Sequence, residues 1–378
     1  MPRYPLGFGM MRLATEEANP ARVKFAEACD MVDAFLSRGF TYFDTSYLYQ
    51  DGHNEENVRE VLVKRHPRES FELATKLPSF LISEKAKVRE TFEEQLDNLG
   101  VNYLDYYLLH SIYSTTYDSR IKDCGMFEFA AEMKHQGKIR HFGFSYHDTP
   151  ELLDRILDEH PETEFVQLIV NYYDWESPFV RSRECYEVAR AHGKKVVVME
   201  PVKGGLLAKL PEPAHSELAA INPGASDASY AIRFAASLDG VLCVLSGMNE
   251  MRQVVDNTDC ILGLKPLSDS EIGLLRSAVA LYKQEGPLGK SDFSAYRNIC
   301  ANGMPVDKVL DAYNSIMVQV SRGHAIQCEN GYYRGLQFLA GRETGKTWIE
   351  GAIVDRDGND ITGLVREAES YLIEHTFL

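Results

Sequence analysis

The chain has 378 residues, of which 44% are hydrophobic and 25% are charged, as in an ordinary globular protein. A formal net charge of −16 and the lack of any long basic run argue against nucleic-acid binding, which needs a positive surface. No run approaches the ~20 apolar residues that a membrane span requires. The first residues, MPRYPLGFGMMRL, lack the apolar centre of a signal peptide. We therefore expect a cytoplasmic protein that contacts neither nucleic acid nor membrane.

Short strand-like runs alternate with helix-like stretches along the first two thirds of the chain. Several runs are continuously apolar and rich in Val, Ile, Leu, Tyr and Phe, which is typical of parallel strands buried on both faces. We predict strands over Tyr4–Phe8, Phe40–Asp44, Phe71–Lys76, Tyr103–His110, Ile139–Ser145, Phe165–Asn171, Lys195–Glu200 and Val241–Ser246.

The segments between these runs have helical spacing. Apolar residues recur every three or four positions at Phe25, Cys29, Val32 and Leu36, and again at Val88, Phe92, Leu96 and Leu99. Ser83 is placed as the N-cap of the second helix, and Thr149, Ser226 and Glu55 indicate the starts of others.

Eight alternations of strand and helix predict an α/β protein with a (β/α)₈ TIM barrel. A doubly wound sheet is the alternative, but no phosphate-binding GxGxxG turn follows the first strand. We assign the barrel to residues 1–281 and a second, mainly helical domain to residues 282–378. Within the latter, 282–345 look helical, most clearly over 306–320, and the tail is predicted to end in a hairpin at DRDGND (355–360) and a helix.

Polar side chains close several of the predicted strands. In a TIM barrel such positions line the active site at the carboxyl ends of the strands. Asp44, Lys76 and His110 end the second, third and fourth strands, and Tyr49 follows Asp44 by five residues. Further polar strand ends are Ser145, Gln167, Asn171 and Glu200.

These residue types together suit acid/base chemistry on a carbonyl or alcohol. A tyrosine alone, with a pKa near ~10, is a weak acid at neutral pH. The ammonium of Lys76 is expected to favour the phenolate of Tyr49, and Asp44 to keep that lysine charged. His110 can orient a carbonyl oxygen. The alternative is a purely structural role, in which Asp44 and Lys76 form an ion pair without part in catalysis and His110 is an ordinary core histidine.

Six segments, in order, resemble signatures of the aldo-keto reductase superfamily. They are FDTSYLY (43–49), ATKLP (74–78), LDYYLLH (104–110), GKIRHFGFSYH (137–147), FVQLIVNYYD (165–174) and MEPVKGG (199–205). The resemblance runs from Gly7 to about Asn257 and implies a nicotinamide-dependent oxidoreductase. It makes Tyr49 the general acid/base, Lys76 and Asp44 its supporting pair, and His110 the residue that orients the carbonyl.

The resemblance also implies a site for NADP or NAD. Ser145 and Gln167 would bind the nicotinamide carboxamide, Met199 would replace the usual stacking tyrosine, and Gly204, Gly205 and Leu206 would lie near the pyrophosphate. Asn257 would contact the adenine. Gly247 and Gln253 fall where NADP-specific members carry cations, with Arg252 and Lys265 as possible substitutes, so the choice between NAD and NADP stays open.

The barrel most resembles the branch of the family with a C-terminal ferredoxin-like domain. Its CxxCxxCxxxCP motif falls here on Ser294, Arg297, Cys300, Met304 and Pro305. One thiolate cannot hold an iron–sulfur cluster, so we expect no cluster, no other metal, and a buried thiol at Cys300. The scattered cysteines, seven in all, indicate reduced thiols.

Three functions compete. The favoured function is net hydride transfer between the nicotinamide cofactor and a carbonyl or alcohol substrate. The second is a redox-neutral reaction, such as epimerisation, that uses a tightly held cofactor. The third is a non-catalytic binding subunit. Tyr47, Tyr113, Tyr172, Tyr173 and Trp175 could form a pocket for a sugar or an aromatic substrate, or pack against the second domain. A homo-oligomer is possible.

Overall fold

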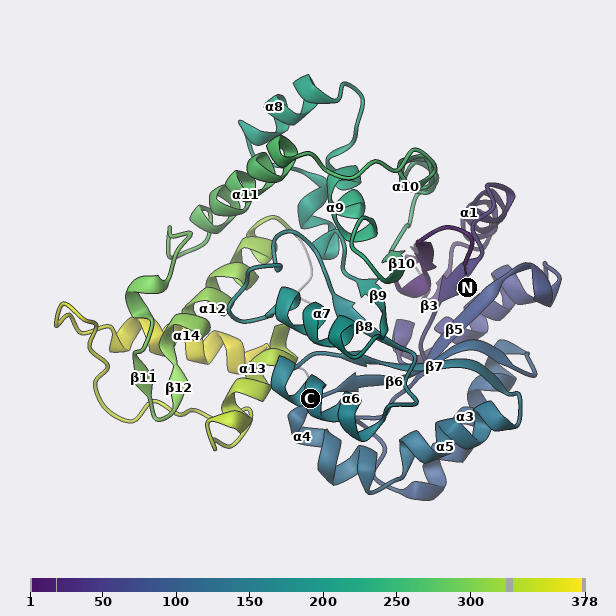
Figure 1. Cartoon of the computed structure of the whole chain (residues 1–378), viewed down its shortest axis with the longest axis horizontal. Helices are drawn as coiled ribbons and strands as arrows, with labels where there is room; N and C mark the ends of the chain where they lie inside the picture. Colours follow the sequence, from purple (N-terminus) through teal and green to yellow (C-terminus); the bar gives the residue numbers. More distant parts are fainter. Residues whose placement is uncertain (1, 18, 324–328, 376–378) are drawn as a thin grey trace.

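A closed parallel β-barrel forms the centre of the molecule (Figure 1). The computed structural model describes residues 2–17, 19–323 and 329–375. The strand order is β1-β10-β9-β8-β7-β6-β5-β4, so that β1 pairs with both β4 and β10. The strands are β1 (Leu6–Gly9), β4 (Tyr42–Asp44), β5 (Glu72–Leu77), β6 (Leu104–Ile112), β7 (Ile139–Tyr146), β8 (Phe165–Ile169), β9 (Lys195–Met199) and β10 (Val241–Ser246). The predicted TIM barrel is confirmed, and each predicted strand overlaps an observed one.

Helices surround the barrel, and most of them bury an apolar face against it. They are α1 (Phe25–Ser37), α2 (Asn54–Val58), α3 (Lys85–Leu99), α4 (Ser114–Thr116), α5 (Met126–His135), α6 (Pro150–Glu159), α7 (Ser182–Ala191), α8 (Ala214–Ile221), α9 (Asp227–Ala236) and α10 (Met251–Leu262). Helix α4 has no buried residue, and α8 packs against α11 (Asp269–Gln284). The side chains of Thr149 and Ser226 cap α6 and α9 as predicted. The prediction for Ser83 is wrong, because α3 starts at Lys85 with Glu84 as its N-cap and no capping side-chain bond.

Short turns and hairpins complete the barrel part. They are the 3₁₀ turns η1 (Met10–Arg12), η2 (Tyr49–Gly52), η4 (Arg68–Ser70) and η6 (Lys203–Ala208), the π-turns η3 (Arg59–Val63) and η5 (Tyr117–Lys122), and the hairpin β2 (Thr15–Glu16)–β3 (Asn19–Val23). No helix in the described ranges is both long enough and apolar enough to cross a membrane.

Side-chain alternation divides each strand between the barrel interior and the helices. Successive side chains of a strand point to opposite faces. Tyr42, Ala74 and Leu108 belong to one buried cluster inside the barrel, with Tyr106, Phe165, Val197, Cys243 and Leu245. A Cβ on Gly7 would lie within 2.8 Å of Cys243, Leu245 and Tyr42, so these three side chains of β10 and β4 leave no room beside β1.

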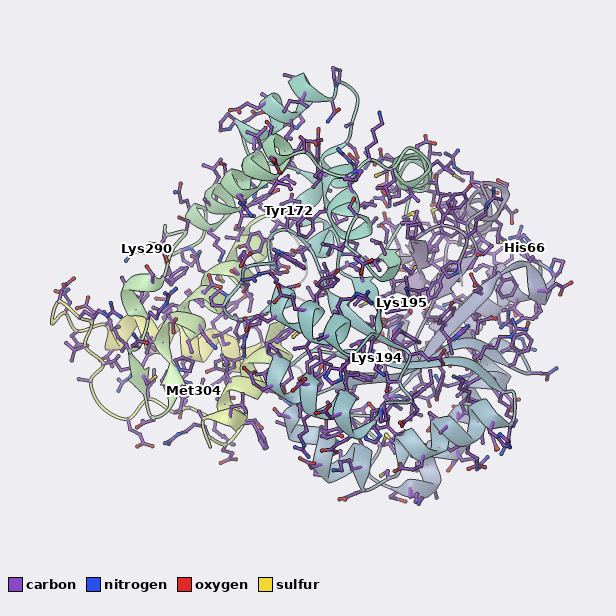
Figure 2. The ribbon with its side chains drawn as sticks, viewed as in Figure 1. His66, Tyr172, Lys194, Lys195, Lys290 and Met304 are labelled. Atoms are coloured by element: carbon purple, nitrogen blue, oxygen red, sulfur yellow. The ribbon has the colours of Figure 1, made fainter. Side chains whose placement is uncertain are left out.

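The C-terminal segment forms a second core on one side of the barrel (Figure 1). Its elements are α11 (Asp269–Gln284), η7 (Ser294–Tyr296), β11 (Cys300–Ala301), β12 (Met304–Pro305), α12 (Val306–Ser321), α13 (Glu329–Leu339) and α14 (Thr362–Glu374). In Figure 2, Lys290 and Met304 mark this side and His66 marks the opposite edge. Since α11 spans the boundary between residues 281 and 282, the proposed division into domains stays a proposal.

The second core closes over the carboxyl end of the barrel. It includes Ile169 at the end of β8, and Phe179 and Val180 from the loop that follows. Met199, at the end of β9, packs against the same cluster. The C-terminal segment therefore covers part of the barrel mouth, where TIM-barrel proteins carry their active sites.

Two expectations for this segment need correction. Residues 285–305 contain no α-helix, only the 3₁₀ turn η7, because Gly286–Pro287 ends the helical course and Asn302–Gly303, both with positive φ, turns the chain into the β11–β12 hairpin. Residues 340–345, after the end of α13, are not helical either, and residues 324–328 of the predicted range lie outside the described residues. Cys300 is exposed, not buried. The turn predicted at residues 355–360 does form, but its flanks pair only through the bridge between Val354 and Asp360.

Candidate active site

Three strands bring polar side chains to one end of the barrel. Asp44, Lys76 and His110 have the same alternation as the inward-facing Tyr42, Ala74 and Leu108 two residues before them. They therefore point inward, at the carboxyl ends of β4, β5 and β6. This is the convergence that the strand ends predicted.

Lys76 lies at the centre of the group. Its ammonium donates to Asp44 Oδ1 at 2.5 Å, to the Thr45 carbonyl at 2.7 Å and to the Tyr49 hydroxyl at 3.1 Å. Burial alone would lower the pKa of Lys76, but the Asp44 carboxylate and the Tyr49 hydroxyl outweigh it and raise that pKa. Lys76 is thus held as a buried cation that can stabilise negative charge on the Tyr49 oxygen.

Tyr49 is carried by a short loop that the rest of the protein holds firmly. Its backbone N–H donates to the Ser46 carbonyl, and the next residue, Gln50, has φ of 53°. Asn54 ties this loop to η1, which follows β1, since its amide donates to the Met10 carbonyl at 3.0 Å and its oxygen accepts from Thr45. A left-handed residue other than glycine persists where the surroundings determine its conformation.

His110 faces Tyr49 across the group, with ring centres 5.9 Å apart. Burial and the charge of Lys76 lower the pKa of His110 well below its usual value, so its ring is neutral. Its Nδ1 lies 3.1 Å from the Ser46 hydroxyl, which itself accepts the Leu48 N–H. Ser46 can therefore donate to Nδ1, which leaves the proton on Nε2 as a donor for a ligand.

A buried polar layer supports Lys76 from behind. Gln95, on α3, donates to the Lys76 carbonyl at 3.0 Å and to Glu55 at 2.8 Å. Thr75 also donates to Glu55. Burial raises the pKa of Glu55 to about 7 despite these bonds. Glu55 lies in the first turn of α2, as predicted, and it is also part of the support of the site.

Ser145 and Gln167 lie side by side, as partners on β7 and β8. Ser145 Oγ accepts the Ser111 N–H at 2.7 Å. The Gln167 side chain is buried, yet its Oε1 has no hydrogen-bond partner among the described residues. A buried unpaired carbonyl oxygen fits a ligand that brings N–H donors, as a carboxamide does.

The remaining residues predicted near the pyrophosphate and the nicotinamide differ in how far they are exposed. Gly204 and Gly205 are partly exposed, with φ of 64° and 107°. Leu206 is buried in a third core, so that only its backbone can reach a ligand. Met199 is partly exposed and packs against the C-terminal core.

The loop after β10 and the helix α10 that follows it hold the residues predicted for the adenosine end. Gln253 accepts the Asn249 N–H at 2.8 Å, and the buried Asn257 donates to Ser246 Oγ at 2.8 Å. Arg252 has an 80% exposed side chain and contacts Glu250. These two bonds tie α10 to the loop before it, whereas the Arg252 side chain points to solvent.

Arg12 is the residue that sequence reasoning missed in this region. A Cβ on Gly247 would lie 2.8 Å from Arg12 Cδ, so the arginine side chain passes directly over that glycine. Arg12 Nη2 is buried and has no hydrogen-bond partner in the described ranges. No sequence signal joined Arg12 to Gly247, because only the pairing of β1 with β10 brings these strand ends together.

Of the five aromatic loop residues predicted to form a substrate pocket, most pack elsewhere in the protein and one lies at the site. Tyr172 and Tyr173 belong to the third core with Tyr282, and Trp175 packs on Phe234. Tyr47 donates to Glu94. Only Tyr113 joins the site, through Phe80, whose ring lies 5.9 Å from His110 and 6.1 Å from Tyr113.

The described residues contain no group of three or more His, Cys, Asp or Glu side chains placed to hold a metal ion. Ser294, Arg297, Cys300, Met304 and Pro305 lie in the loop, turn and hairpin before α12. Cys328 lies outside the described residues.

Fold and site together define a TIM-barrel protein with its polar groups gathered at the carboxyl ends of the strands, where enzymes of this fold act. The family model described as "Aldo/keto reductase family" matches residues 5–280. The chain belongs to the aldo/keto reductase family, and it is an oxidoreductase of that family.

Individual relatives support this assignment. "Uncharacterized oxidoreductase YqkF" of Bacillus subtilis is 24% identical over 303 residues, 72% of this chain and 91% of the relative. An aldo-keto reductase of Mycolicibacterium paratuberculosis is 28% identical over 256 residues, 67% of this chain and 79% of the relative.

Solved structures agree with the fold. Aldo-keto reductase AKR11C1 from Bacillus halodurans, in its holo form, gives a TM-score of 0.58 at 26% identity, covering 72% of this chain and 91% of its own. A Klebsiella pneumoniae aldo/keto reductase in complex with NADP and acetate gives 0.59 at 21% identity, covering 73% and 91%.

Proposed function

We propose that this protein reduces a carbonyl group of a small molecule, or oxidises the matching alcohol, with NADP or NAD as cofactor and Tyr49 as general acid/base. The observation that carries the proposal is the contact of Lys76 with both Asp44 and Tyr49 in a buried setting. A structural ion pair would not need a tyrosine hydroxyl as third partner.

The residues supply the proton side of the reaction. His110 donates from Nε2 to the carbonyl oxygen and orients it. As negative charge develops on that oxygen, Tyr49 gives up its hydroxyl proton, and Lys76 stabilises the phenolate that remains. In the reverse direction the Tyr49 phenolate takes the alcohol proton. The cofactor, when bound, supplies or accepts the hydride at the substrate carbon.

The residues present fit a nicotinamide cofactor. The unpaired Oε1 of Gln167, with Ser145 beside it, suits the carboxamide. The unpaired Nη2 of Arg12 suits a phosphate oxygen at the loops after β9 and β10, where TIM barrels frequently bind phosphate. Gly204 and Gly205 offer backbone N–H groups in the first of these loops. The NADP complex of the Klebsiella pneumoniae relative agrees with this choice of cofactor.

The direct test is turnover. Purified full-length protein should consume NADPH in proportion to aldehyde added, followed by loss of absorbance of the reduced cofactor, with alcohol formed in equal amount. A protein that binds NADPH but reduces none of a broad set of aldehydes and ketones would contradict net reduction. Nicotinamide released on denaturation of freshly purified protein would then favour the redox-neutral alternative. If the protein binds no cofactor at all, the non-catalytic alternative would be favoured.

Arg12→Ala should weaken NADP binding by about tenfold or more, because it removes a charge-assisted hydrogen bond to phosphate. Arg252→Ala is the matched control and should change the affinity by less than about twofold, since Arg252 is exposed and already contacts Glu250. Dissociation constants for NADP and NAD are measured side by side by calorimetry.

A loss confined to NADP would place Arg12 at the 2′-phosphate, whereas an equal loss for both cofactors would place it at the diphosphate. If Arg12 contacts only the diphosphate, we expect the dissociation constants of wild type for NADP and NAD to differ by no more than about tenfold, or ~1.4 kcal/mol. Unchanged binding in Arg12→Ala together with a loss in Arg252→Ala would contradict the assignment.

A further inference from the structure

Helix α13 of the C-terminal segment is seated closely against the barrel mouth. It contacts α4, which follows β6 (Figure 1). A Cβ on Gly335 would lie 3.0 Å from both carboxylate oxygens of Asp148, in the loop after β7. A Cβ there would require the Asp148 carboxylate or α13 to move by a few tenths of an ångström, so α13 and this loop are tightly packed.

A row of rings leads from the catalytic group to α13. We call Phe80, Tyr113, His147 and Tyr332 the aromatic wall. The Phe80 ring lies 5.9 Å from His110, and successive rings of the wall are 6.1, 6.0 and 6.1 Å apart. The wall joins the loops after β5, β6 and β7 to the C-terminal segment.

Arg334, on α13, lies near Tyr113, the second ring of this wall. Its Nε is buried without a hydrogen-bond partner, and it forms no ion pair with any described residue. Burial lowers the pKa of Arg334, while the neighbouring Tyr113 opposes that effect. A partly buried guanidinium without a counter-ion is costly, so an anion from outside the chain would be bound favourably there.

His147 offers a second polar group in the same place. Its side chain is 2% exposed, and its Nδ1 has no partner in the described part of the chain. Burial lowers the pKa of His147 to about 3, so the ring is neutral. The adjacent Asp148 is engaged elsewhere, because its two oxygens accept the Ser114 and Thr149 N–H groups, each at 2.7 Å.

We propose that Arg334 binds an oxyanion, a carboxylate or a phosphate, on the substrate whose carbonyl lies at Tyr49 and His110. The body of the substrate then lies along the aromatic wall, with His147 as a further hydrogen-bonding group. This inference rests on the proposed function and names its substrate class: carbonyl compounds with an anionic end. It also gives the C-terminal segment a role in selecting the substrate.

The experiment uses probes that share one aldehyde and differ in charge: 4-carboxybenzaldehyde, 4-formylphenyl phosphate and methyl 4-formylbenzoate. With full-length protein and NADPH, kcat/KM for at least one anionic probe should exceed that for the ester by about tenfold or more, the range expected for a charge-assisted hydrogen bond. Arg334→Gln should abolish this preference and leave the ester unaffected, and Arg334→Lys should keep part of it.

Arg342→Gln is the matched control, because it removes the same charge from the same segment. The Arg342 side chain binds the Asn302 carbonyl and faces Glu350, both within the C-terminal segment, and its loss should leave the preference intact. A readout independent of turnover is the calorimetric binding of benzene-1,4-dicarboxylate to wild type and to Arg334→Gln, each saturated with NADP. We expect at least about tenfold weaker binding by Arg334→Gln.

The outcomes separate this inference from the proposed function. Equal kcat/KM for all three probes in wild type, or an Arg334→Gln variant that loses activity equally on anionic and neutral probes, would overturn the assignment of Arg334. If no probe is reduced but the dicarboxylate binds through Arg334, the proposed function fails and the anion site stands. If the dicarboxylate does not bind to wild type, the anion site is refuted.

Discussion

Tyr49→Phe should lower the rate of the chemical step by at least ~10²-fold, within the range for loss of a positioned general acid. The change removes only the hydroxyl that accepts a hydrogen bond from Lys76 at 3.1 Å, so the loop and the buried ion pair keep their places. The rate is measured in single-turnover reactions with saturating NADPH and an aldehyde that wild type reduces.

Cofactor affinity provides the control for Tyr49→Phe. Because Tyr49 is assigned to the substrate oxygen and not to the cofactor, the NADPH dissociation constant should change by less than about threefold, or ~0.7 kcal/mol. A second control is Tyr47→Phe, since Tyr47 contacts Glu94 away from the ion pair and should retain near wild-type turnover. Near-full turnover by Tyr49→Phe would mean that another group supplies the proton.

Lys76→Met should cost both activity and stability. Removing one member of a buried ion pair leaves the other charge uncompensated, which typically costs ~3–5 kcal/mol. Lys76 is 1% exposed and Asp44 3% exposed, so the Asp44 carboxylate would be left in a dry environment. The free energy of unfolding is measured by denaturant titration at neutral pH, and turnover is measured as above.

The double variant Asp44→Asn, Lys76→Met separates the two effects. With no charge left unpaired, much of the lost stability should return, whereas turnover should stay low because no ammonium stabilises the Tyr49 phenolate. If the double variant regained turnover along with stability, the pair would be purely structural and its assigned part in catalysis would be wrong.

The strands of the barrel could be predicted because each is a short apolar run between turn signals. The polar residues that end them followed from the same pattern, since parallel strands present their carboxyl ends at one face. Asp44, Lys76 and His110 were therefore found together without any knowledge of packing.

Other features depend on contacts between segments that are distant in the sequence, so no local sequence pattern could predict them. Arg12 and Gly247 meet only because the barrel closes, and Arg334 comes near Tyr113 only because α13 packs against α4. The helix expected across residues 285–305 does not form for local reasons: Gly286–Pro287 ends α11, and Asn302–Gly303 forms a hairpin turn.

The position of β1 between β4 and β10 has a consequence for how the protein is made. The barrel cannot close until Val241–Ser246 has left the ribosome, because β1 has only one of its two neighbours before then. Such long-range pairing slows folding and keeps apolar edges exposed meanwhile. During synthesis the edge of Leu6–Gly9 that later pairs with β10 therefore stays open.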